Sequence, residues 1–250
     1  MNRTDTALVP AITRHARKTP GHEQRVAHAL ALLREAADRH QGHIVQAPSL
    51  GVEGMVITDL IARHQLPIVV ATLDTGALHA QTRALIPRIE SRYGIRVERF
   101  GPHPEAALRF VRDHGQLAMR QSVELRKACC ALRKLEPMQR LLAGHQAWIT
   151  GLRREQSQDR AEVPFRDRDA QGRAKYYPLA DWSLEDIWHY VQAHDVPYNE
   201  LHDRGYPSIG CQPCTRATVD GEDERAGRWW WELGTAKECG LHSRPHPVAA

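Results

Sequence analysis

The sequence predicts an α/β fold with a mostly parallel sheet flanked by helices, followed by an irregular C-terminal segment. Short apolar segments rich in β-branched residues alternate with segments of helical periodicity over roughly residues 22–194. Such alternation is typical of a parallel sheet that helices cover on both faces. The composition agrees with a folded chain, because 42% of the 250 residues are hydrophobic and 26% are charged.

Each expected element has its own signal in the sequence. A helix is expected over roughly residues 22–40, because Val26, Leu30, Leu33 and Ala37 recur at helical spacing. After about residue 195 the alternation stops, and the chain becomes rich in Gly, Pro, Cys and Trp. The expected strands are 44–47, 67–73, 96–100 and 147–152, and the expected later helices are 52–61, 77–93, 104–114 and one that starts at Ser183.

The charge and the apolar segments narrow the classes of function. The formal net charge is +4, most of the 34 basic residues are arginines, and no block of five or six like charges occurs. Such a chain suits small anionic ligands better than long nucleic acid, because one guanidinium can bind two oxygens of a phosphate or sulfate at once. The first twenty residues lack the apolar core of a signal peptide, and no segment approaches the ~20 apolar residues of a membrane span. We therefore expect a cytoplasmic protein with no membrane segment and no nucleic-acid partner.

Three turns follow the carboxyl ends of expected strands. In open α/β sheets, ligands bind outside these ends, so we expect the turns to meet at one pocket. Backbone N–H groups after Ser49 and around Thr75 could bind an anion there. The turns are Ser49-Leu50-Gly51, Asp74-Thr75-Gly76 and residues 150–154.

Four of the five cysteines form two pairs. Cys129 and Cys130 are adjacent, and Cys211 and Cys214 have the C-x-x-C spacing of zinc and iron–sulfur sites. Two pairs can supply four thiolates to one metal centre, and adjacent thiols on a helix reach a bulky cluster more easily than a single zinc ion. Two alternatives stay open: the first pair could be small buried side chains, and the second a redox-active dithiol.

The fifth cysteine, Cys239, lies close to the C-terminus, far in sequence from both pairs. Lys237 and His242 flank it, and positive neighbours favour the nucleophilic thiolate form of a cysteine. A lone cysteine near a terminus is also often inert, so the residues alone leave both interpretations open.

A series of motifs extends over most of the chain and resembles the assimilatory adenylyl-sulfate reductases, which are relatives of the phosphoadenylyl-sulfate reductases. The resemblance covers roughly residues 44–242. The motifs are Leu73-Asp74-Thr75-Gly76, Cys129-Cys130 with Arg133-Lys134, ITGLRREQS at 149–157, GYPSIGC at 205–211, GEDERAGRWWW at 221–231 and KECGLH at 237–242.

The resemblance implies a fold, a cofactor and a substrate. The fold is a Rossmann-like domain of the adenine-nucleotide hydrolase type. Family members that carry both cysteine pairs typically use adenosine 5′-phosphosulfate (APS), and Lys134 matches a lysine near the cluster and the substrate. In one departure, Gly54 stands where the nucleotide loop usually has an acidic residue. The implied cofactor is a [4Fe–4S] cluster on Cys129, Cys130, Cys211 and Cys214.

On this basis the chain divides into three segments. Residues 1–20 are expected to be a flexible N-terminal arm, and residues 21–228 the nucleotide-binding domain that includes the iron–sulfur site. Residues 229–250 are expected to be a mobile catalytic tail, and the protein is expected to form a homo-oligomer.

The chemistry of APS suggests roles for individual residues. A thiolate that attacks the sulfur of APS forms an S-sulfocysteine and releases AMP, and a second thiol then releases sulfite. Cys239 is the expected nucleophile. Thioredoxin or a similar dithiol protein is the expected partner, since no second cysteine remains to complete the reduction. The reaction would belong to sulfate assimilation and cysteine biosynthesis. The expected substrate contacts are Ser49, Gly51, Asp74, Thr75, Gly76, Lys134, Arg153, Arg154, Arg225 and Arg228.

Three other functions are weighed against this one. An ATP-pyrophosphatase-type ligase or sulfurtransferase would carry a Ser-Gly-Gly-x-Asp-Ser loop, which the chain lacks. A cluster-based redox sensor would need a DNA-reading helix or a basic stripe, and neither is visible. A phosphoadenylyl-sulfate (PAPS) reductase with a cluster is hard to separate by sequence, because one extra arginine can accommodate a 3′-phosphate.

Overall fold

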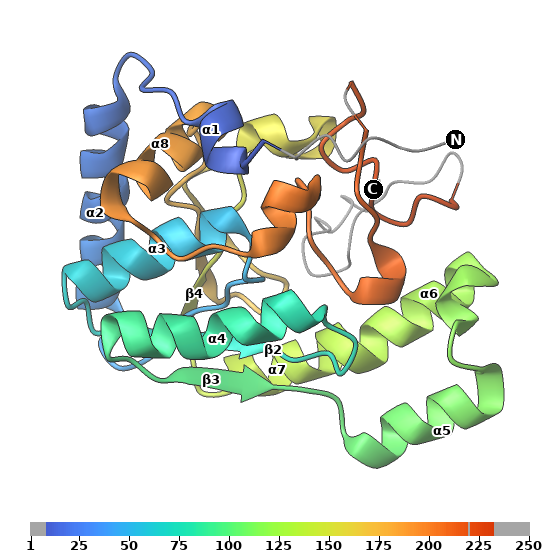
Figure 1. Ribbon diagram of the computed structural model, residues 1–250. Coiled ribbons are helices and arrows are strands. Elements are labelled where there is room, and N and C mark those ends of the chain that lie inside the picture. The colour runs from blue at the N-terminus through green and yellow to red at the C-terminus, as the bar shows by residue number, and fades with distance from the viewer. Residues whose placement is uncertain (1–8, 220, 233–250) are drawn as a thin grey trace, which may run out of the picture.

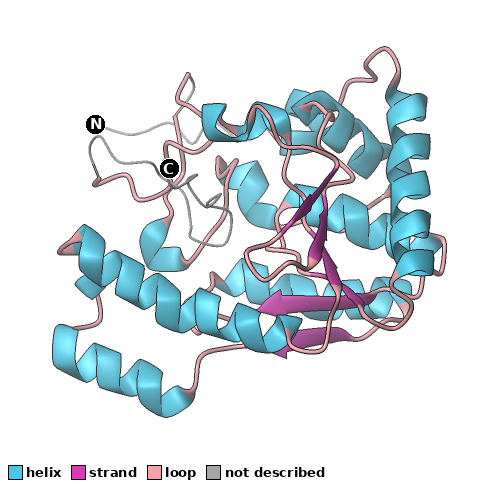
Figure 2. Ribbon diagram, turned by 180° about the vertical axis from the view of Figure 1, so that it is seen from behind, coloured by secondary structure: helices cyan, strands magenta, loops and turns pink. Residues whose placement is uncertain are grey.

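The computed structural model describes residues 9–219 and 221–232, and these form a six-stranded sheet with helices on both faces (Figure 1). The strand order is β3-β2-β1-β4-β6-β5, and all neighbouring strands are parallel except β5 and β6. The view from behind shows that the sheet is twisted (Figure 2). The expected mostly parallel α/β fold is therefore confirmed.

The elements lie close to their expected positions. The strands are β1 (Ile44–Gln46), β2 (Val69–Leu73), β3 (Val97–Phe100), β4 (Ala147–Ile149), β5 (Arg166–Arg168) and β6 (Ala174–Tyr176). All four expected strands are present, as are the expected helices that correspond to α2–α5 and α8. The helices are α1 (Ala11–His15), α2 (His22–Arg39), α3 (Val52–Arg63), α4 (Ala80–Tyr93), α5 (Pro104–His114), α6 (Val123–Cys130), α7 (Glu136–Leu142) and α8 (Leu184–His194).

The two faces of the sheet have separate hydrophobic cores, because successive side chains of a strand point to opposite faces. Ile44 of β1 packs on the side of α2, α3, α4 and α8. The next residue, Val45, packs on the opposite side with Trp148 of β4 and with Met138 and Leu141 of α7. The continuous apolar character of the inner strands follows from this burial on both faces.

Residues 11–15, within the segment expected to be a flexible arm, form the short helix α1. α1 contacts α8, the side chain of Ala11 is buried, and its N–H donates to the carboxylate of Asp203 at 2.8 Å. A helix of five residues is too short to show a period in the sequence and depends on tertiary contacts for its stability.

The hairpin of β5 and β6 was also not expected from the sequence. All three residues of β5 are exposed, and they read Arg-Asp-Arg. Charged side chains on an edge strand prevent further strand pairing, so this strand lacks the apolar pattern by which buried strands are detected.

Residues 123–142 form a helical segment with a π-helical turn, Ala131–Leu135, between α6 and α7. Ser122 caps α6 by accepting a hydrogen bond from the N–H of Leu125 at 3.1 Å. The π turn follows directly after Cys129 and Cys130 and contains Lys134. Such turns change the direction of side chains within a helix and occur often at functional sites.

Within residues 9–219 and 221–232, every helix is too short or too polar to span a lipid bilayer.

Candidate functional site

A cavity of about 180 Å³ lies at the carboxyl ends of β1, β2 and β4. The strand order reverses between β1 and β4, and ligands of open α/β sheets bind at such reversals. Residues of all three expected turns line this cavity, which we call the substrate cavity: Ser49 and Gly51, Thr75, and Thr150. The expectation that these turns meet at one pocket is therefore confirmed.

The turn after β1 is compact and leads directly into α3. Leu50 has a positive φ of 61°, and a Cβ atom at Gly54 would lie 2.9 Å from the Cβ of Pro48. An acidic side chain at position 54 would therefore displace the turn, which accounts for the glycine. Gly51 and Glu53 also line the cavity, so the N-terminus of α3 borders it. A helix N-terminus favours a bound anion.

The turn after β2 presents one side chain to the cavity. Thr75 lines the cavity, whereas Asp74 and Gly76 do not. The carboxylate of Asp74 accepts a hydrogen bond from the N–H of Gly76 at 3.1 Å, and Gly76 has a φ of +66°. Asp74 and Gly76 thus shape the turn, and their expected substrate contacts stay predictions.

Two of the five expected basic residues do not line the substrate cavity. Arg153 is completely buried, and Arg154 donates to the carbonyl of Val163 at 2.9 Å and stacks over Phe165. The guanidinium of Arg153 pairs with buried carboxylates and that of Arg154 lies over an aromatic ring, so their expected substrate contacts stay predictions. The cations that line the cavity are Lys134, Arg160, Arg225 and Arg228.

Arg160 was not expected at the site, because in this part of the sequence the expected substrate cations are Arg153 and Arg154. Its guanidinium donates to the side-chain oxygen of Gln156 at 2.6 Å, and both residues line the cavity. Three arginines between residues 153 and 160 are a visible signal, but only the tertiary structure shows which of them lines the cavity.

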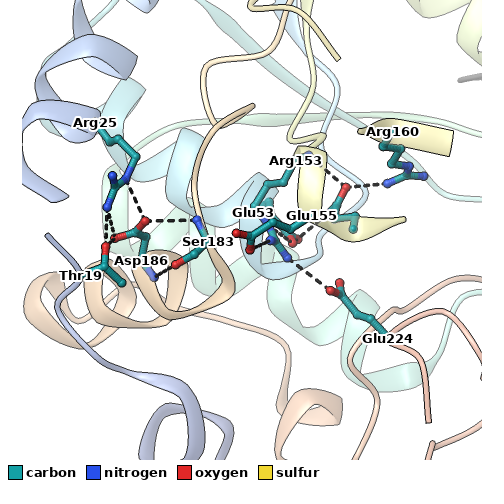
Figure 3. Close-up of polar contacts among 10 residues, drawn as sticks. Thr19, Arg25, Glu53, Arg153, Glu155, Arg160, Ser183, Asp186 and Glu224 are labelled. Atoms are coloured by element: carbon teal, nitrogen blue, oxygen red, sulfur yellow. Dashed lines mark hydrogen bonds and ion pairs between the residues drawn. The ribbon is translucent and has the colours of Figure 1, made fainter. Parts of the chain in front are cut away.

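A buried network joins the loop after β4 to two other segments (Figure 3). Arg153 donates to the carboxylate of Glu53 at 3.0 Å and to that of Glu224 at 3.4 Å. Gln156 also donates to Glu53, at 2.8 Å. The Cβ of Glu53 leaves no room for a side chain at Gly151, since a Cβ there would lie 2.8 Å from it. Neither Glu53 nor Glu224 was expected at the site, although both line the cavity.

The two carboxylates of this network ionise differently. Burial raises the pKa of Glu53, but the charge of Arg153 and the hydrogen bonds outweigh it, so the pKa is lowered and the group is ionised. Burial, together with the charge of Glu53, raises the pKa of Glu224 to about 7. Two carboxylates that face one guanidinium cannot both be fully compensated.

His202 also lines the cavity and was not expected there. Burial lowers its pKa to about 4, so the imidazole is neutral at physiological pH. Its Nε2 atom has no hydrogen-bond partner among the described residues. Its ring packs edge-on against Trp188, which holds its orientation.

All four paired cysteines line a second cavity, which we call the cysteine cavity. The hydroxyl of Thr75 lies 3.3 Å from the sulfur of Cys211, and the N–H of Gln212 donates to the carbonyl of Ala77 at 2.8 Å. The turn after β2 therefore borders both cavities. The structure brings the two cysteine pairs together, as the sequence analysis expected.

The chemistry of the four sulfurs fits an iron–sulfur cluster. Burial raises the pKa of the Cys129 thiol, and burial together with Cys211 raises the pKa of Cys214 to about 11. Within the described part of the chain, no three His, Cys, Asp or Glu side chains are arranged to hold a single metal ion. Four cysteines around one apolar cavity are, however, the donor set of iron–sulfur proteins.

Lys134 lines both the substrate cavity and the cysteine cavity. Arg228 lies near the same boundary, since it lines the substrate cavity and stacks over Trp229, which lines the cysteine cavity. The expected position of Lys134 between a cluster and a substrate therefore has a geometric basis.

The tryptophan run packs beside the cysteine cavity. Trp229 is fully buried between the guanidinium groups of Arg126 and Arg228, whose central carbons lie 4.7 and 4.9 Å from its ring. Arg126 also pairs with Glu232. Trp229 therefore has a packing role. Cys239, the expected nucleophile, lies outside the described residues.

Comparisons with known proteins agree with this geometry. The family model for the phosphoadenosine phosphosulfate reductase domain matches residues 43–217. The chain is 54% identical over 221 residues to the adenosine 5′-phosphosulfate reductase of Allochromatium vinosum, which covers 88% of this chain and 86% of the relative.

Solved structures show the same fold. The chain is similar to a phosphoadenylyl-sulfate reductase from Candida auris in a phosphate complex, with 26% identity and a TM-score of 0.64 over 79% of this chain and 98% of that one. It shares only the fold with the FMN adenylyltransferase of Candida glabrata in complex with ATP, at 16% identity and a TM-score of 0.54 over 80% of this chain and 66% of the other. The expected adenine-nucleotide hydrolase type of fold is confirmed by these similarities.

Proposed function

Because the chain belongs to the phosphoadenosine phosphosulfate reductase domain family, we propose that it reduces APS to sulfite and AMP. The relative from Allochromatium vinosum, which is named for this substrate, supports the proposal. The observation that carries it is a cavity lined by four cations that borders a second cavity lined by four cysteines, with Lys134 in both.

The substrate cavity suits an anionic mixed anhydride. APS carries negative charge on its phosphate and on its sulfate, and guanidinium groups bind such oxygens in pairs. Lys134, Arg160, Arg225 and Arg228 supply the positive charge, and the N-terminus of α3 adds to it. Lys134 also lines the cysteine cavity, and Arg228 stacks over Trp229 at its wall, so we place the phosphosulfate at that end.

The proposed reaction is a thiol-dependent reduction. The thiolate of Cys239 attacks the sulfate sulfur, the bond between this sulfur and the phosphate oxygen breaks, and AMP leaves with the electron pair. The product is an S-sulfocysteine. A thiolate of a dithiol protein then attacks Cys239, which releases sulfite and forms a mixed disulfide. The second thiol of that protein resolves the disulfide, so the dithiol is oxidised by two electrons and the Cys239 thiol is restored.

The reductant in this proposal is thioredoxin or a similar dithiol protein. Cys129, Cys130, Cys211 and Cys214 line the cysteine cavity, so no cysteine of the chain remains to release sulfite from Cys239. We place the reaction in the cytoplasm, where thiols stay reduced, as a step of sulfate assimilation that leads to cysteine.

We further propose that the four cysteines of the cysteine cavity hold a [4Fe–4S] cluster. When bound, the cluster would supply a charged centre that tunes the electrostatic field at Lys134 and the sulfate. Lys134 itself supports this role, because it is the cation that lines both cavities.

The test is a sulfite-release assay on the anaerobically purified protein with reduced thioredoxin, comparing APS with PAPS. We expect turnover with APS, and an S-sulfonated Cys239 by mass spectrometry when the dithiol is left out. Cys239→Ser should still bind APS but release no sulfite. Activity on PAPS alone would contradict the proposal that APS is the substrate. Full turnover by Cys239→Ser would contradict the proposal that Cys239 is the nucleophile.

A further inference from the structure

The segment Glu224–Trp229 carries two of the cavity's cations and is attached at both ends. At its C-terminal end, the N–H of Arg216 donates to the carbonyl of Gly227 at 3.0 Å, and the N–H of Trp229 donates to the carbonyl of Cys214 at 3.2 Å. A Cβ at Gly227 would lie 2.3 Å from the carbonyl oxygen of Arg216, so the contact is close. Backbone contacts therefore fix Arg228 beside the cysteine pair.

At the N-terminal end, the side chain of Glu224 attaches the segment to the buried network. The carboxylate of Glu224 accepts from the buried guanidinium of Arg153 at 3.4 Å, and the same guanidinium binds Glu53 at the start of α3 (Figure 3). Arg225 follows Glu224 directly and lines the substrate cavity. Arg225 is thus adjacent to a contact that ties its segment to the turn after β1.

We propose that Glu224 is a positioning residue: through the buried guanidinium of Arg153, its carboxylate holds Arg225 at the substrate cavity. This inference rests on the proposed function, because it assigns Arg225 to the binding of the anionic substrate. Glu224 acts through Arg225 and does not take part in the reaction.

Several charged groups face Glu224. Arg153 and Arg160 come from the loop after β4, Glu53 from the start of α3, and Arg225 from its own segment. Glu53 is ionised and competes for Arg153, which keeps the Glu224 carboxylate weakly compensated. The pKa of Glu224, raised to about 7 by burial and by Glu53, means that the carboxylate gains its full charge only above neutral pH.

Positioning and simple charge repulsion make opposite predictions. If Glu224 only repelled the anionic substrate, removing its charge would tighten binding of APS. If Glu224 holds Arg225 in place, removing its charge weakens the contact with Arg153 and so weakens the binding of APS. The sign of the change therefore distinguishes the two.

The experiment measures the Kd of APS and of AMP by calorimetry at pH 8 and pH 6. All variants carry Cys239→Ser, so that APS is not consumed. We expect Glu224→Gln to raise the Kd of APS about tenfold at pH 8, because the neutral amide loses the charge-assisted part of the contact with Arg153. The Kd of AMP should rise in the same direction at pH 8, because AMP is also an anion. In the protein with Glu224 intact, lowering the pH to 6 should weaken binding of APS in the same direction, whereas Glu224→Gln should lose this pH dependence. Glu224→Asp should restore part of the affinity.

The matched control is Glu155→Gln, which removes another carboxylate facing Arg153, at 3.7 Å, from a side chain that is 61% exposed. It should leave the Kd of APS unchanged. In an Arg225→Ala background, Glu224→Gln should have little further effect. Tighter binding by Glu224→Gln, or an equal loss with and without Arg225, would overturn the inference. Failure of the Cys239→Ser protein to bind APS at all would reject the proposed function instead.

Discussion

At the scale of single residues, close packing decides which basic side chain reaches the substrate cavity. The guanidinium of Arg228 lies against Gly210 on one side and against the ring of Trp229 on the other. It also donates to the hydroxyl of Ser208 at 3.3 Å. A charged group held in this way is already oriented before the ligand arrives, which lowers the entropic cost of binding.

Gly210→Ala tests this arrangement. The new Cβ would lie 2.5 Å from the nearest guanidinium nitrogen of Arg228, so the guanidinium must move. We expect the KM for APS to rise about tenfold, since a charge-assisted contact is lost. The free energy of unfolding should fall by only about 1 kcal/mol, the cost of mild overpacking.

In an Arg228→Ala background, the same Gly210→Ala substitution should have no further effect on KM. A KM that is unchanged by Gly210→Ala in the otherwise native chain would show that the position of Arg228 does not matter for binding.

At the scale of elements, the N-terminus of α8 joins three segments of the chain. Ser183 and Asp186 form a capping box, in which each side chain accepts a hydrogen bond from the other's backbone N–H at 3.1 Å. The carboxylate of Asp186 also binds Thr19 and Arg25 (Figure 3). It binds His22 as well, so it attaches α2 and the segment before it to α8. One buried carboxylate thus stabilises both a helix end and the packing of two helices.

Asp186→Asn should lower the free energy of unfolding by about 3 kcal/mol, because it breaks a buried ion pair and leaves Arg25 poorly compensated. Burial raises the pKa of Asp186, but hydrogen bonds from Arg25, Thr19 and His22 outweigh it and lower the pKa below the ordinary 3.8. This contribution to stability is therefore complete above pH 3.8 and is lost as the pH falls below it. Urea unfolding at pH 7 and pH 3 measures both effects.

Glu185→Gln, in the same helical turn, is the control and should change the free energy of unfolding by no more than about 0.5 kcal/mol. If Asp186→Asn were equally neutral at pH 7, the capping box and its ion pairs would not contribute to stability.

At the scale of the whole molecule, the two cavities share their walls. Thr75, Lys134 and Cys211 line the substrate cavity, and Lys134 and Cys211 also line the cysteine cavity. The backbone bridge between Thr215 and Arg228 connects the C-x-x-C segment to the segment that carries Arg225 and Arg228, which line the substrate cavity. A substitution at the cysteine cavity should therefore change the affinity of the substrate cavity for its ligand.

Cys214→Ala tests this coupling with two readouts. We expect the purified protein to lose its iron and labile sulfide, and the Kd of APS to rise about tenfold, within the usual range of coupling between sites. Cys239→Ser should keep its iron, because this cysteine is not part of the cysteine cavity in our proposal. Complete loss of iron with an unchanged Kd and full turnover would mean that the two cavities are energetically independent.

Much of the fold follows from the sequence, and the exceptions have physical causes. The inner strands are detected because burial on both faces makes them continuously apolar. β5 was missed because an exposed edge strand needs no apolar side chains, and α1 was missed because five residues hold too little of a helical period. The division into arm, domain and tail, and the homo-oligomer, stay predictions.

The sequence by itself determined the strand–helix alternation, the spacing of four cysteines as two close pairs, and the three turns that line the substrate cavity. These properties depend on residue type and spacing along the chain, which are local. Only the tertiary structure decided that Arg160 lines the cavity while Arg153 is buried between Glu53 and Glu224. Charged side chains of the same type take different roles according to which distant carboxylate or ring they meet, and such contacts between residues 100 or 71 positions apart leave no local pattern in the sequence.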